Sequence, residues 1–398
     1  MAPADRSLRN GKPLRVLHVI TRMIVGGAQE NTLLSCALID PAHFPSTLLT
    51  GPETGAEGEL HAETQARGVR LLVEPSLVRR VSPWHDLVAT FRLWRTIRGG
   101  RYDVVHTHSS KAGILGRFAA VLAGAPVIVH TAHGWSFNEH QPRHLYWLYV
   151  WLERLCARFS GAIVVVGRPD RDEGLALRIG RPEQYRLIRS GIEVKSYRDV
   201  EISREQARCR LGLPSEAFVI GSVGRLCEQK APLDLLEAFV PVARARPDVR
   251  LVYVGDGPQR PELEAAVMRH GLAHRVQLVG LRRDVPELLR AFDLFALASR
   301  WEGLPRVFPQ AMAAGLPIVA TLVDGAPDAI TPGVNGWLVE VGDTAAMADR
   351  LGALAADPAT ARRMGAAGRA RVEEFSAHRM VHELAELYTR LAMNGAAH

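Results

Sequence analysis

The chain has 398 residues, of which 47% are hydrophobic and 23% charged, so it is long enough to form more than one hydrophobic core. A length prior of about 150 residues per domain predicts two domains. This composition, without a low-complexity tract, excludes the disordered and fibrous classes of protein. The net charge of +7 favours anionic partners, whether phosphorylated substrates, acidic lipid or nucleic acid.

The expected location of the protein follows from its apolar segments. The longest apolar run, 145–152, is far shorter than the roughly 20 residues of a membrane-spanning helix, and no basic-then-apolar leader opens the chain. We therefore expect a cytoplasmic protein.

The cysteines are widely spaced without a Cys-x-x-Cys pair, which argues against a zinc ribbon or a disulfide framework and predicts buried thiols. They are Cys36, Cys156, Cys209 and Cys227.

Short β-branched runs alternate with helical patterns in both halves of the chain. The predicted strands of the first half are 14–20, 69–73, 103–106, 127–130 and 162–166. Those of the second half are 218–223, 250–254, 276–279, 294–297 and 317–321. Because βαβ order implies parallel strands, the sequence predicts an α/β protein with two parallel sheets.

The domain boundaries follow from the same alternation. We expect one Rossmann-like domain over 13–195 and a second over 203–375, with a polar linker and the first helix of the second domain within 193–214. A last amphipathic helix over 376–393 could cross back to the first domain. Ligands of open α/β sheets bind at the carboxyl ends of the strands, so two facing domains would place a site in a deep cleft between them.

The segment after Ser82 has the sequence pattern of an amphipathic helix. Ser82 is the predicted N-cap, Pro83 stands in the first turn and Gly99 ends the helix. The apolar residues at helical spacing predict a face that packs on a sheet. They are Trp84, Leu87, Val88, Phe91 and Trp94.

A glycine turn with two cations follows the strand at 218–223. Gly224 allows the backbone to approach phosphate oxygens, and Arg225 and Lys230 supply the positive charge that a leaving diphosphate requires. On its own, such a group is equally consistent with a turn glycine and two surface cations. The segment after the strand at 294–297 favours the phosphate-binding interpretation.

This second segment places a carboxylate directly before a predicted helix. Glu302 would lie at the carboxyl edge of the sheet, and the helix is expected to begin near Pro305, where free backbone amides can hold a phosphate. Gln310 lies about a turn and a half further along that helix. Carboxylate and amide side chains can both bind sugar or ribose hydroxyls.

Together these segments resemble the family-4 retaining glycosyltransferases of GT-B fold, whose hallmark is two glutamates separated by seven residues. Glu302 matches the first glutamate, and Gln310 departs from the second. The resemblance implies that Glu302 holds the donor hexose, that residue 310 holds the ribose, and that Arg225 and Lys230 stabilise the diphosphate. Glutamine keeps a hydroxyl-binding role but excludes proton transfer. The donor-binding residues so implied are Gly224, Gly303, Leu304, Arg306, Val307, Gln310 and Arg282.

The resemblance extends over nearly the whole chain, through motifs at 254–258, 323–328 and 335–338. Gly26, Gly27 and Gln29 are similar to the glycine loop after the first strand of the family, where they would contact phosphate or acceptor. The glycine pair is also consistent with a simple tight turn.

Histidines gather at the strand ends of the first half of the chain. His106 and His108, like His130 and His133, are spaced so that each pair shares one region of a sheet. A metal site is one interpretation, but no acidic residue or cysteine stands beside them at ligand spacing, so we expect neither metal nor cofactor. Hydrogen-bonded core histidines are the favoured interpretation of His106 and His130. By the resemblance, His133 reaches the donor sugar as a catalytic residue.

The segment 142–158 is aromatic on nearly all sides and flanked by arginines. Burial between the sheet and a neighbouring helix explains this pattern, and insertion into a membrane interface is the alternative. If it contacts the membrane, the acceptor is expected to be lipid-linked, and the positive charge would meet anionic head groups at the inner face of the cytoplasmic membrane.

The favoured hypothesis is therefore a retaining, metal-independent hexosyltransferase. It would take a nucleoside-diphosphate sugar, with a UDP-sugar favoured, and act on a glycan or polyprenyl-linked acceptor in exopolysaccharide, capsule or O-antigen synthesis. We find no carboxylate placed for a double displacement, which is compatible with front-face transfer. The alternatives are a catalytically silent sugar-nucleotide sensor or scaffold, an epimerase or phosphorylase on the same fold, and, least favoured, a nucleic-acid-binding protein.

Overall fold

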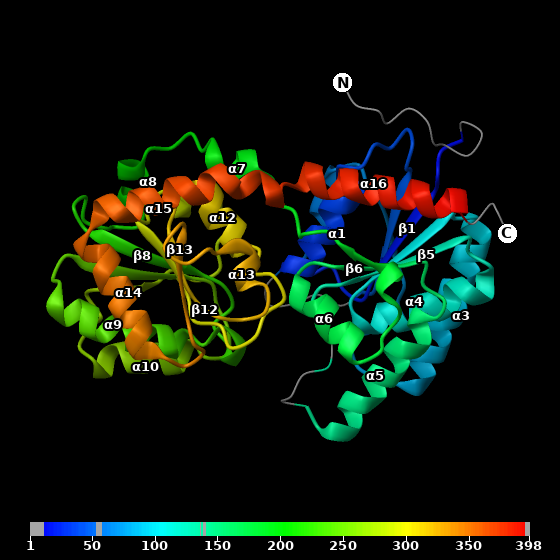
Figure 1. Ribbon diagram of the computed structural model, residues 1–398, viewed down its shortest axis with the longest axis horizontal. Coiled ribbons are helices and arrows are strands. Elements are labelled where there is room, and N and C mark those ends of the chain that lie inside the picture. The colour runs from blue at the N-terminus through cyan, green and yellow to red at the C-terminus, as the bar shows by residue number, and fades with distance from the viewer. Residues whose placement is uncertain (1–11, 53–57, 136, 138–140, 395–398) are drawn as a thin grey trace. The chain divides into compact units, whose positions relative to one another are not determined.

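The computed structural model describes residues 12–52, 58–135, 137 and 141–394. Two compact units divide the chain: unit 1 consists of Met1–Gly191 with Ala377–His398, and unit 2 of Ile192–Ser376. Each unit has a parallel sheet with helices packed on it (Figure 1). The structure thus confirms the predicted pair of Rossmann-like domains. The predicted cleft between them stays a prediction.

The sheet of unit 1 has the strand order β3-β2-β1-β4-β5-β6-β7, and all its neighbours are parallel. Its strands are β1 (Val16–Ile20), β2 (Ser46–Thr50), β3 (Arg70–Val73), β4 (Val104–His108), β5 (Val127–Ala132), β6 (Ala162–Val165) and β7 (Tyr185–Leu187). The order reverses between β1 and β4. In sheets of this kind that switch point is where ligands bind.

Helices cover both faces of this sheet. They are α1 (Gly27–Ala37), α2 (His61–Ala66), α3 (Pro83–Gly100), α4 (Ser110–Ala123), α5 (Arg143–Ala157), α6 (Arg168–Ala176) and α16 (Ala377–Asn394). On one face, α1 and α16 pack on the sheet through Leu34, Leu384 and Leu387. On the other face, α3 and α4 do so through Leu93, Ile97 and Ala112. None of the described helices is long and apolar enough to cross a membrane.

The face of α3 that the sequence predicts to pack on the sheet is exposed instead. Trp84, Leu87 and Phe91 are 71%, 63% and 54% exposed. The buried side of α3 is formed by Ala89, Leu93 and Ile97, which are four residues apart and so lie on one stripe. Trp94 is partly buried and packs against this core, as predicted. The prediction was wrong for Trp84, Leu87 and Phe91, because the larger apolar residues were assumed to be the buried ones, whereas contact with α4 and the sheet uses the narrower stripe.

An ion pair lies in the core of unit 1, between α4 and α5. Arg117 Nη2 donates to Glu153 Oε2 over 2.7 Å, and both side chains are at most 2% exposed. Arg117 Nε also donates to the backbone carbonyl of Gly113. Because each charge has lost its hydration, the pair is held by mutual attraction and by these hydrogen bonds.

The sheet of unit 2 has the order β10-β9-β8-β11-β12-β13 and is parallel throughout. Its strands are β8 (Phe218–Val223), β9 (Val249–Val254), β10 (Val276–Leu278), β11 (Leu294–Leu297), β12 (Ile318–Thr321) and β13 (Gly336–Val339). Its helices are α7 (Val194–Arg198), α8 (Arg204–Arg210), α9 (Pro232–Ala245), α10 (Arg260–Arg269), α11 (Val285–Leu289), α12 (Val307–Ala314), α13 (Ala326–Ala329), α14 (Thr344–Ala356) and α15 (Pro358–Arg371).

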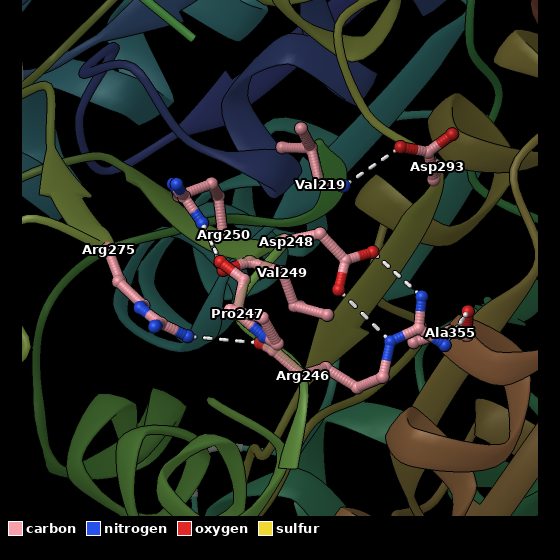
Figure 2. A network of polar contacts seen from close by, with 9 residues as sticks. All are labelled: Val219, Arg246, Pro247, Asp248, Val249, Arg250, Arg275, Asp293 and Ala355. Carbon is pink, nitrogen blue, oxygen red and sulfur yellow. Dashed lines mark hydrogen bonds and ion pairs between the residues drawn. The ribbon is translucent and has the colours of Figure 1, made fainter. Parts of the chain in front are cut away.

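Several arginines of unit 2 stabilise the amino-terminal edge of its sheet (Figure 2). Arg246 makes two hydrogen bonds to Asp248 and one to the carbonyl of Ala355. Arg275 donates to the carbonyl of Arg246. Asp293 accepts the backbone N–H of Val219 at the start of β8. These contacts close loops at the sheet edge opposite the glycine turn, so part of the positive charge has a structural role.

The cysteines differ from the prediction. All four are free thiols. Cys36 and Cys156 are buried, as expected, and burial raises the pKa of the Cys156 thiol to about 11. Cys209 is exposed and Cys227 is partly exposed, so the prediction of buried thiols was wrong for these two. Both stand in short polar segments, which a count of cysteine spacing does not register.

The buried ion pair makes unit 1 sensitive to loss of one charge. We expect Glu153→Gln to lower the free energy of unfolding by about 3 kcal/mol, because the Arg117 guanidinium stays buried without a counter-charge. Urea unfolding followed by tryptophan fluorescence measures this loss. The matched control is Glu386→Gln, whose carboxylate is 68% exposed and pairs with His382. Equal unfolding midpoints for Glu153→Gln and the control would contradict the expectation.

Candidate active site

The glycine turn of unit 2 follows β8 and packs closely against the loop after β9. Gly224 N–H donates to the carbonyl of Val254 over 2.9 Å. A Cβ added to Gly255 would lie 2.0 Å from the Gly224 carbonyl oxygen, and Gly255 has φ 140°, so only glycine fits this close approach. A small pocket opens here. It is lined by Ser222, Gly224, Arg225, Leu226, Lys230, Pro232, Tyr253 and Leu297.

A short helical turn, Glu228–Lys230, positions Lys230 at this pocket. The next residue, Ala231, adopts φ 43° and ψ 56°, a left-handed conformation that is unfavourable for a residue with a Cβ. Ala231 is also the N-cap of α9. Strained backbone of this kind persists where the surrounding structure imposes it, and it often marks a functional loop.

Glu302 lies beside Lys230, so the structure brings together two of the residues that the sequence predicts for one site. Glu302 Oε1 accepts a hydrogen bond from Lys230 Nζ and a second from Ser299 Oγ over 2.8 Å. The Glu302 side chain is 8% exposed and that of Lys230 21%. The pair therefore sits at a partly dehydrated edge of the pocket, where charge interactions are stronger than in water.

The loops after β11 and β12 are joined by hydrogen bonds next to Glu302. Gly325 N–H donates to the carbonyl of Gly303 over 2.8 Å. The Asp324 carboxylate accepts the backbone N–H of Glu302, yet the pKa of Asp324 is raised, first by burial of its carboxyl and then by the charge of Glu302. Residue 324 as a whole is exposed, but its carboxyl lies against the backbone of Glu302 in the loop after β11. The site thus has two neighbouring carboxylates.

The helix after Glu302 begins at Val307, two residues later than the expected start near Pro305. Proline and the following residue form the turn that leads into it: Phe308 N–H donates to the Pro305 carbonyl. Leu304, Arg306 and Gln310 are buried, at 7%, 9% and 8% exposure. Gln310 is thus held on a buried part of α12.

Arg282 lies in the loop after β10 and is engaged elsewhere. Its Nε and Nη2 donate to the two carboxylate oxygens of Asp284 over 2.8 and 2.5 Å. This bond raises the pKa of the Arg282 guanidinium and lowers that of the Asp284 carboxyl. A contact of Arg282 with a donor would have to share this ion pair, so its donor-binding role stays a prediction.

In unit 1, the predicted glycine loop follows β1 and leads into α1. Gly26 is the N-cap of α1, and its carbonyl accepts the N–H of Glu30. The Gln29 side chain folds back over the glycine: a Cβ at Gly26 would meet Gln29 Oε1 at 2.7 Å. A larger residue at position 26 would only have to displace the end of this flexible side chain, since Gly26 itself has an extended backbone with φ 178°. Whether Gly26, Gly27 and Gln29 also contact a ligand stays a prediction.

Histidines on or directly after three neighbouring strands of unit 1 form a hydrogen-bonded cluster. His18 Nδ1 lies 3.0 Å from His108 Nε2, and His108 Nδ1 lies 3.2 Å from His133 Nε2. His106 contacts the hydroxyls of Tyr388 and Thr131, at 2.5 and 2.7 Å. His18 and His106 are paired residues of neighbouring strands, so they share a face of the sheet with His108.

The prediction that His106 and His130 are hydrogen-bonded core residues is confirmed. Both are buried, and His130 Nδ1 lies 3.0 Å from Thr107 Oγ1. Burial lowers the pKa of His18 to about 3. Burial, followed by repulsion from neighbouring charged groups, holds the pKa values of His106, His108 and His130 well below the ordinary range. These four buried histidines are therefore neutral at physiological pH.

Three of these rings come close enough to hold a metal ion. The ligand atoms of His18, His106 and His108 lie within 4.8 Å of one another. However, both ring nitrogens of His106 and both of His108 already face hydrogen-bond partners. A metal would have to displace these partners, so we interpret the cluster as a hydrogen-bonded network.

The residue after His108 has a strained backbone. Ser109 adopts φ 60° and ψ 163°, a region that is nearly restricted to glycine. Its Oγ lies 2.9 Å from Thr21 Oγ1 at the end of β1, and its carbonyl accepts the N–H of Gly113. These bonds fix the turn between β4 and α4 at the switch point of the sheet.

Sequence reasoning did not single out four residues of these two sites. Ser299 and Asp324 stand within motifs that the family resemblance covers, but their own contacts with Glu302 depend on loop geometry. His108 was noted only as a member of a His-x-His pair, and His18 was not considered because it lies inside an apolar strand. The only available signal was the alternation of His18 with buried apolar residues, which places it on a sheet face.

Comparison with known proteins identifies the class. Residues 26–191 match the family described as "Glycosyl transferase 4-like domain", and residues 217–357 match "Glycosyl transferases group 1". The chain is 31% identical over 336 residues to the UDP-Gal:alpha-D-GlcNAc-diphosphoundecaprenol alpha-1,3-galactosyltransferase of Escherichia coli, which covers 83% of this chain and 85% of the relative. This protein therefore belongs to the family-4 glycosyltransferases, and it is a glycosyltransferase of GT-B fold.

Other relatives have different substrates in their names. The alpha-maltose-1-phosphate synthase of Mycolicibacterium smegmatis is 30% identical over 311 residues, which is 73% of this chain and 79% of the relative. Among solved structures, Anabaena HepE in complex with UDP-glucose has a TM-score of 0.81 and 24% identity, covering 94% of this chain and 99% of HepE. That last likeness shows the fold alone. Family membership thus leaves the substrates to be inferred from the site.

The neutral histidine cluster makes stability fall in mild acid. Unfolded histidines take up protons near pH 6.5, whereas the four buried histidines with lowered pKa values stay neutral, so the unfolded state binds more protons as the pH falls below that value. The contribution is fully present above about pH 6.5, and each histidine removes up to about 1.4 kcal/mol per pH unit below it.

Urea unfolding between about pH 7 and pH 5.5 measures this slope. His130→Gln should lower the slope of the unfolding free energy against pH by an amount that corresponds to nearly one bound proton. The control His382→Gln, at a 59% exposed side chain, should leave it unchanged. A pH-independent free energy of unfolding in this range would contradict neutral burial of the cluster.

Proposed function

We propose that this protein transfers a hexose from UDP to a lipid-linked glycan acceptor with retention of the anomeric configuration and without a metal ion. The observation that carries the proposal is the contact of Lys230 with Glu302 and of Glu302 with Ser299, at a glycine turn. A diphosphate needs cations and backbone amides, and a hexose needs hydrogen-bond acceptors next to them. The two requirements meet on neighbouring loops of unit 2.

Each residue has a distinct part in this proposal. Lys230 and Arg225 stabilise the negative charge that grows on the diphosphate as the glycosidic bond breaks. Glu302 binds hydroxyls of the hexose, and Gln310 binds the ribose through its amide oxygen and N–H groups. By the family resemblance, His133 hydrogen-bonds to the hexose near the reacting carbon. No proton transfer is assigned to Gln310.

Retention is proposed on a front-face course. The acceptor hydroxyl attacks the anomeric carbon on the side from which the diphosphate leaves, and its proton passes to a phosphate oxygen. The C–O bond to the diphosphate breaks as the C–O bond to the acceptor forms, so no enzyme carboxylate is consumed. Lys230 assists by holding the phosphate oxygen that accepts the proton.

A UDP-sugar and a lipid-linked acceptor are supported by the relatives. The name of the E. coli relative gives UDP-galactose as its donor and a diphosphoundecaprenol-linked sugar as its acceptor. HepE was solved with UDP-glucose. We extend these properties to this chain as a proposal, because the donor loops carry the cations that any nucleoside diphosphate requires.

Exposed apolar residues on α3 and α5 support contact with the membrane that holds such an acceptor. On α5, Trp147 and Trp151 are 51% and 58% exposed, while Val150 and Cys156 are buried, so the helix is apolar on its outer as well as its inner side. The expectation that burial explains all of this aromatic segment is therefore wrong. Tryptophan at the surface suits a membrane interface.

The exposed face of α3 adds a second apolar area with basic neighbours. Residues 79–101 contain six arginines and one acid, Asp86, which pairs with Lys111. Exposed arginines border the apolar residues of α3, which favours a surface of anionic lipid over a neutral one. We therefore place the acceptor side of the enzyme at an anionic membrane, in agreement with the expected lipid-linked acceptor.

The donor site is tested by binding and turnover with UDP-, GDP- and ADP-hexoses in the presence of EDTA. We expect one UDP-hexose to bind and to be transferred or slowly hydrolysed, with the anomeric configuration retained by NMR. Glu302→Gln and Lys230→Met should each lower kcat/KM about a hundredfold, because each removes a charge-assisted contact in the transition state. Glu237→Gln, an exposed acid of α9, is the matched control. Binding of a donor without transfer or hydrolysis would instead support the sugar-nucleotide sensor, and no binding to any of the three donors would contradict the proposed donor site.

The membrane contact is tested by sedimentation with vesicles of phosphatidylglycerol and of phosphatidylcholine. We expect binding to the anionic vesicles that decreases with added salt. Replacing Trp84 and Phe91 by alanine should weaken it at least about tenfold, because buried aromatic area is lost from the lipid. Met268 and Val341, 68% and 44% exposed in unit 2, give a matched alanine control. Equal binding of both double variants would exclude α3 from the contact.

A further inference from the structure

The imidazoles of His18, His108 and His133 form a continuous hydrogen-bonded chain from the buried core of unit 1 to the end of β5. Two contacts of 3.0 and 3.2 Å join them. His18 and His108 are 0% and 1% exposed, whereas His133 is partly exposed. Only the last ring of the chain therefore reaches the surface of the sheet edge.

Neutral rings in such a chain must be oriented together. A neutral imidazole has one N–H donor and one acceptor nitrogen, so His108 can donate to one neighbour only if it accepts from the other. Two arrangements satisfy both contacts. In the first, each of the three rings carries its proton on Nδ1; in the second, each carries it on Nε2.

The buried end of the chain distinguishes the two arrangements. His18 Nε2 is buried and has no hydrogen-bond partner among the described residues. The second arrangement would place an N–H donor at this atom, and buried donors without a partner are rarer in proteins than unsatisfied acceptors. The first arrangement leaves only a lone pair there, so it is favoured.

We infer that His108, itself fixed by His18, is a positioning residue that holds His133 in the tautomer with its proton on Nδ1. His133 then accepts from His108 at Nε2 and is a hydrogen-bond donor, not a base, at Nδ1. The importance of this for catalysis rests on the proposed contact of His133 with the donor sugar. A donor suits that place, since sugar and phosphate oxygens accept hydrogen bonds.

Rigid surroundings support a positioning role for His108. The ring of His106 lies beside it, with ring centroids 4.2 Å apart and the planes tilted by 31°, and is itself hydrogen-bonded to Tyr388 and Thr131. The strained Ser109 follows directly, and its hydroxyl is bonded to Thr21. The neighbouring His106 ring restricts the His108 side chain, and the Ser109 contacts restrict the adjoining backbone. A residue that orients a catalytic group must be restricted in this way.

The tautomer is measured directly by 15N NMR of the full-length protein labelled at histidine, without substrate and after treatment with EDTA. We expect the resonances of His133, assigned with His133→Gln, to show a protonated Nδ1 and an unprotonated Nε2. A proton on Nε2 of His133, or a metal ion retained in stoichiometric amount, would overturn the inference. This readout does not depend on activity, so it stands apart from the proposed function.

Two variants of His108 test the role in turnover. The amide of His108→Asn can place an N–H near the position of Nδ1, whereas His108→Leu cannot. We expect His108→Leu to lower kcat about tenfold to a hundredfold with little change in KM and to let His133 sample both tautomers, and His108→Asn to restore most of both properties. An unchanged His133 spectrum in His108→Leu would overturn the inference.

The remaining outcomes separate the tautomer from its use. If His108→Leu does not fold, His18→Phe provides the second test, because His108 then loses the partner that fixes its own proton, and the spectrum of His133 should again show both tautomers. A changed His133 spectrum with unchanged turnover would support the positioning role and count against the proposed contact of His133 with the donor.

Discussion

The ion pair of Lys230 and Glu302 is the interaction on which the proposed donor site depends. β8 and β11 are neighbours in the sheet, so the loops that follow them lie side by side, and the pair joins them across 72 residues of sequence. Glu302 fixes the ammonium at the pocket before any substrate is present. A diphosphate that enters therefore meets a cation already in place, and little reorganisation is needed when charge develops.

The second requirement is that the histidine cluster stays neutral. Several imidazoles within hydrogen-bonding distance of one another would repel strongly if protonated, and burial prevents that charge from being hydrated. Neutral rings can instead act as paired donors and acceptors, which gives the cluster a defined set of proton positions. The strand register brings this about, because His18 and His106 face each other on β1 and β4 and His108 follows two residues later on the same face.

Much of the fold was predictable because β-branched runs and helix patterns mark most strands. Three strands were missed, for a physical reason: β7 has only three residues, β2 is the mixed run Ser46–Thr50, and β13 is the short run Gly336–Val339 that begins with a glycine, so none has a clear apolar pattern. The error on α3 arose because an amphipathic pattern shows that a helix has two faces but not which one meets the sheet. Trp84 and Phe91 are large, yet Leu93 and Ile97 form the contact.

The residues proposed to bind the donor were predicted from spacing and resemblance, but their contacts could not be predicted in this way. The hydrogen bonds of Glu302 to Ser299 and of Asp324 to the Glu302 backbone depend on loop conformations that no periodicity encodes. The same holds for Arg282, whose bond to Asp284 is a local loop contact. Residue type defines what chemistry is possible, and the loops determine which groups meet.

Gln310 departs from the family pattern in a way that the proposed ribose-binding role accommodates. A hydrogen bond to a charged acceptor contributes about 1.5–3 kcal/mol and a neutral one about 0.5–1.5 kcal/mol, so the loss from glutamine is on the order of 1 kcal/mol, or roughly a factor of ten in affinity. Glutamine also removes a negative charge from a site that already has Glu302 and Asp324 and must accept a diphosphate. These two effects on the affinity for a nucleotide oppose each other, and neither alters the roles proposed for Lys230 and Glu302.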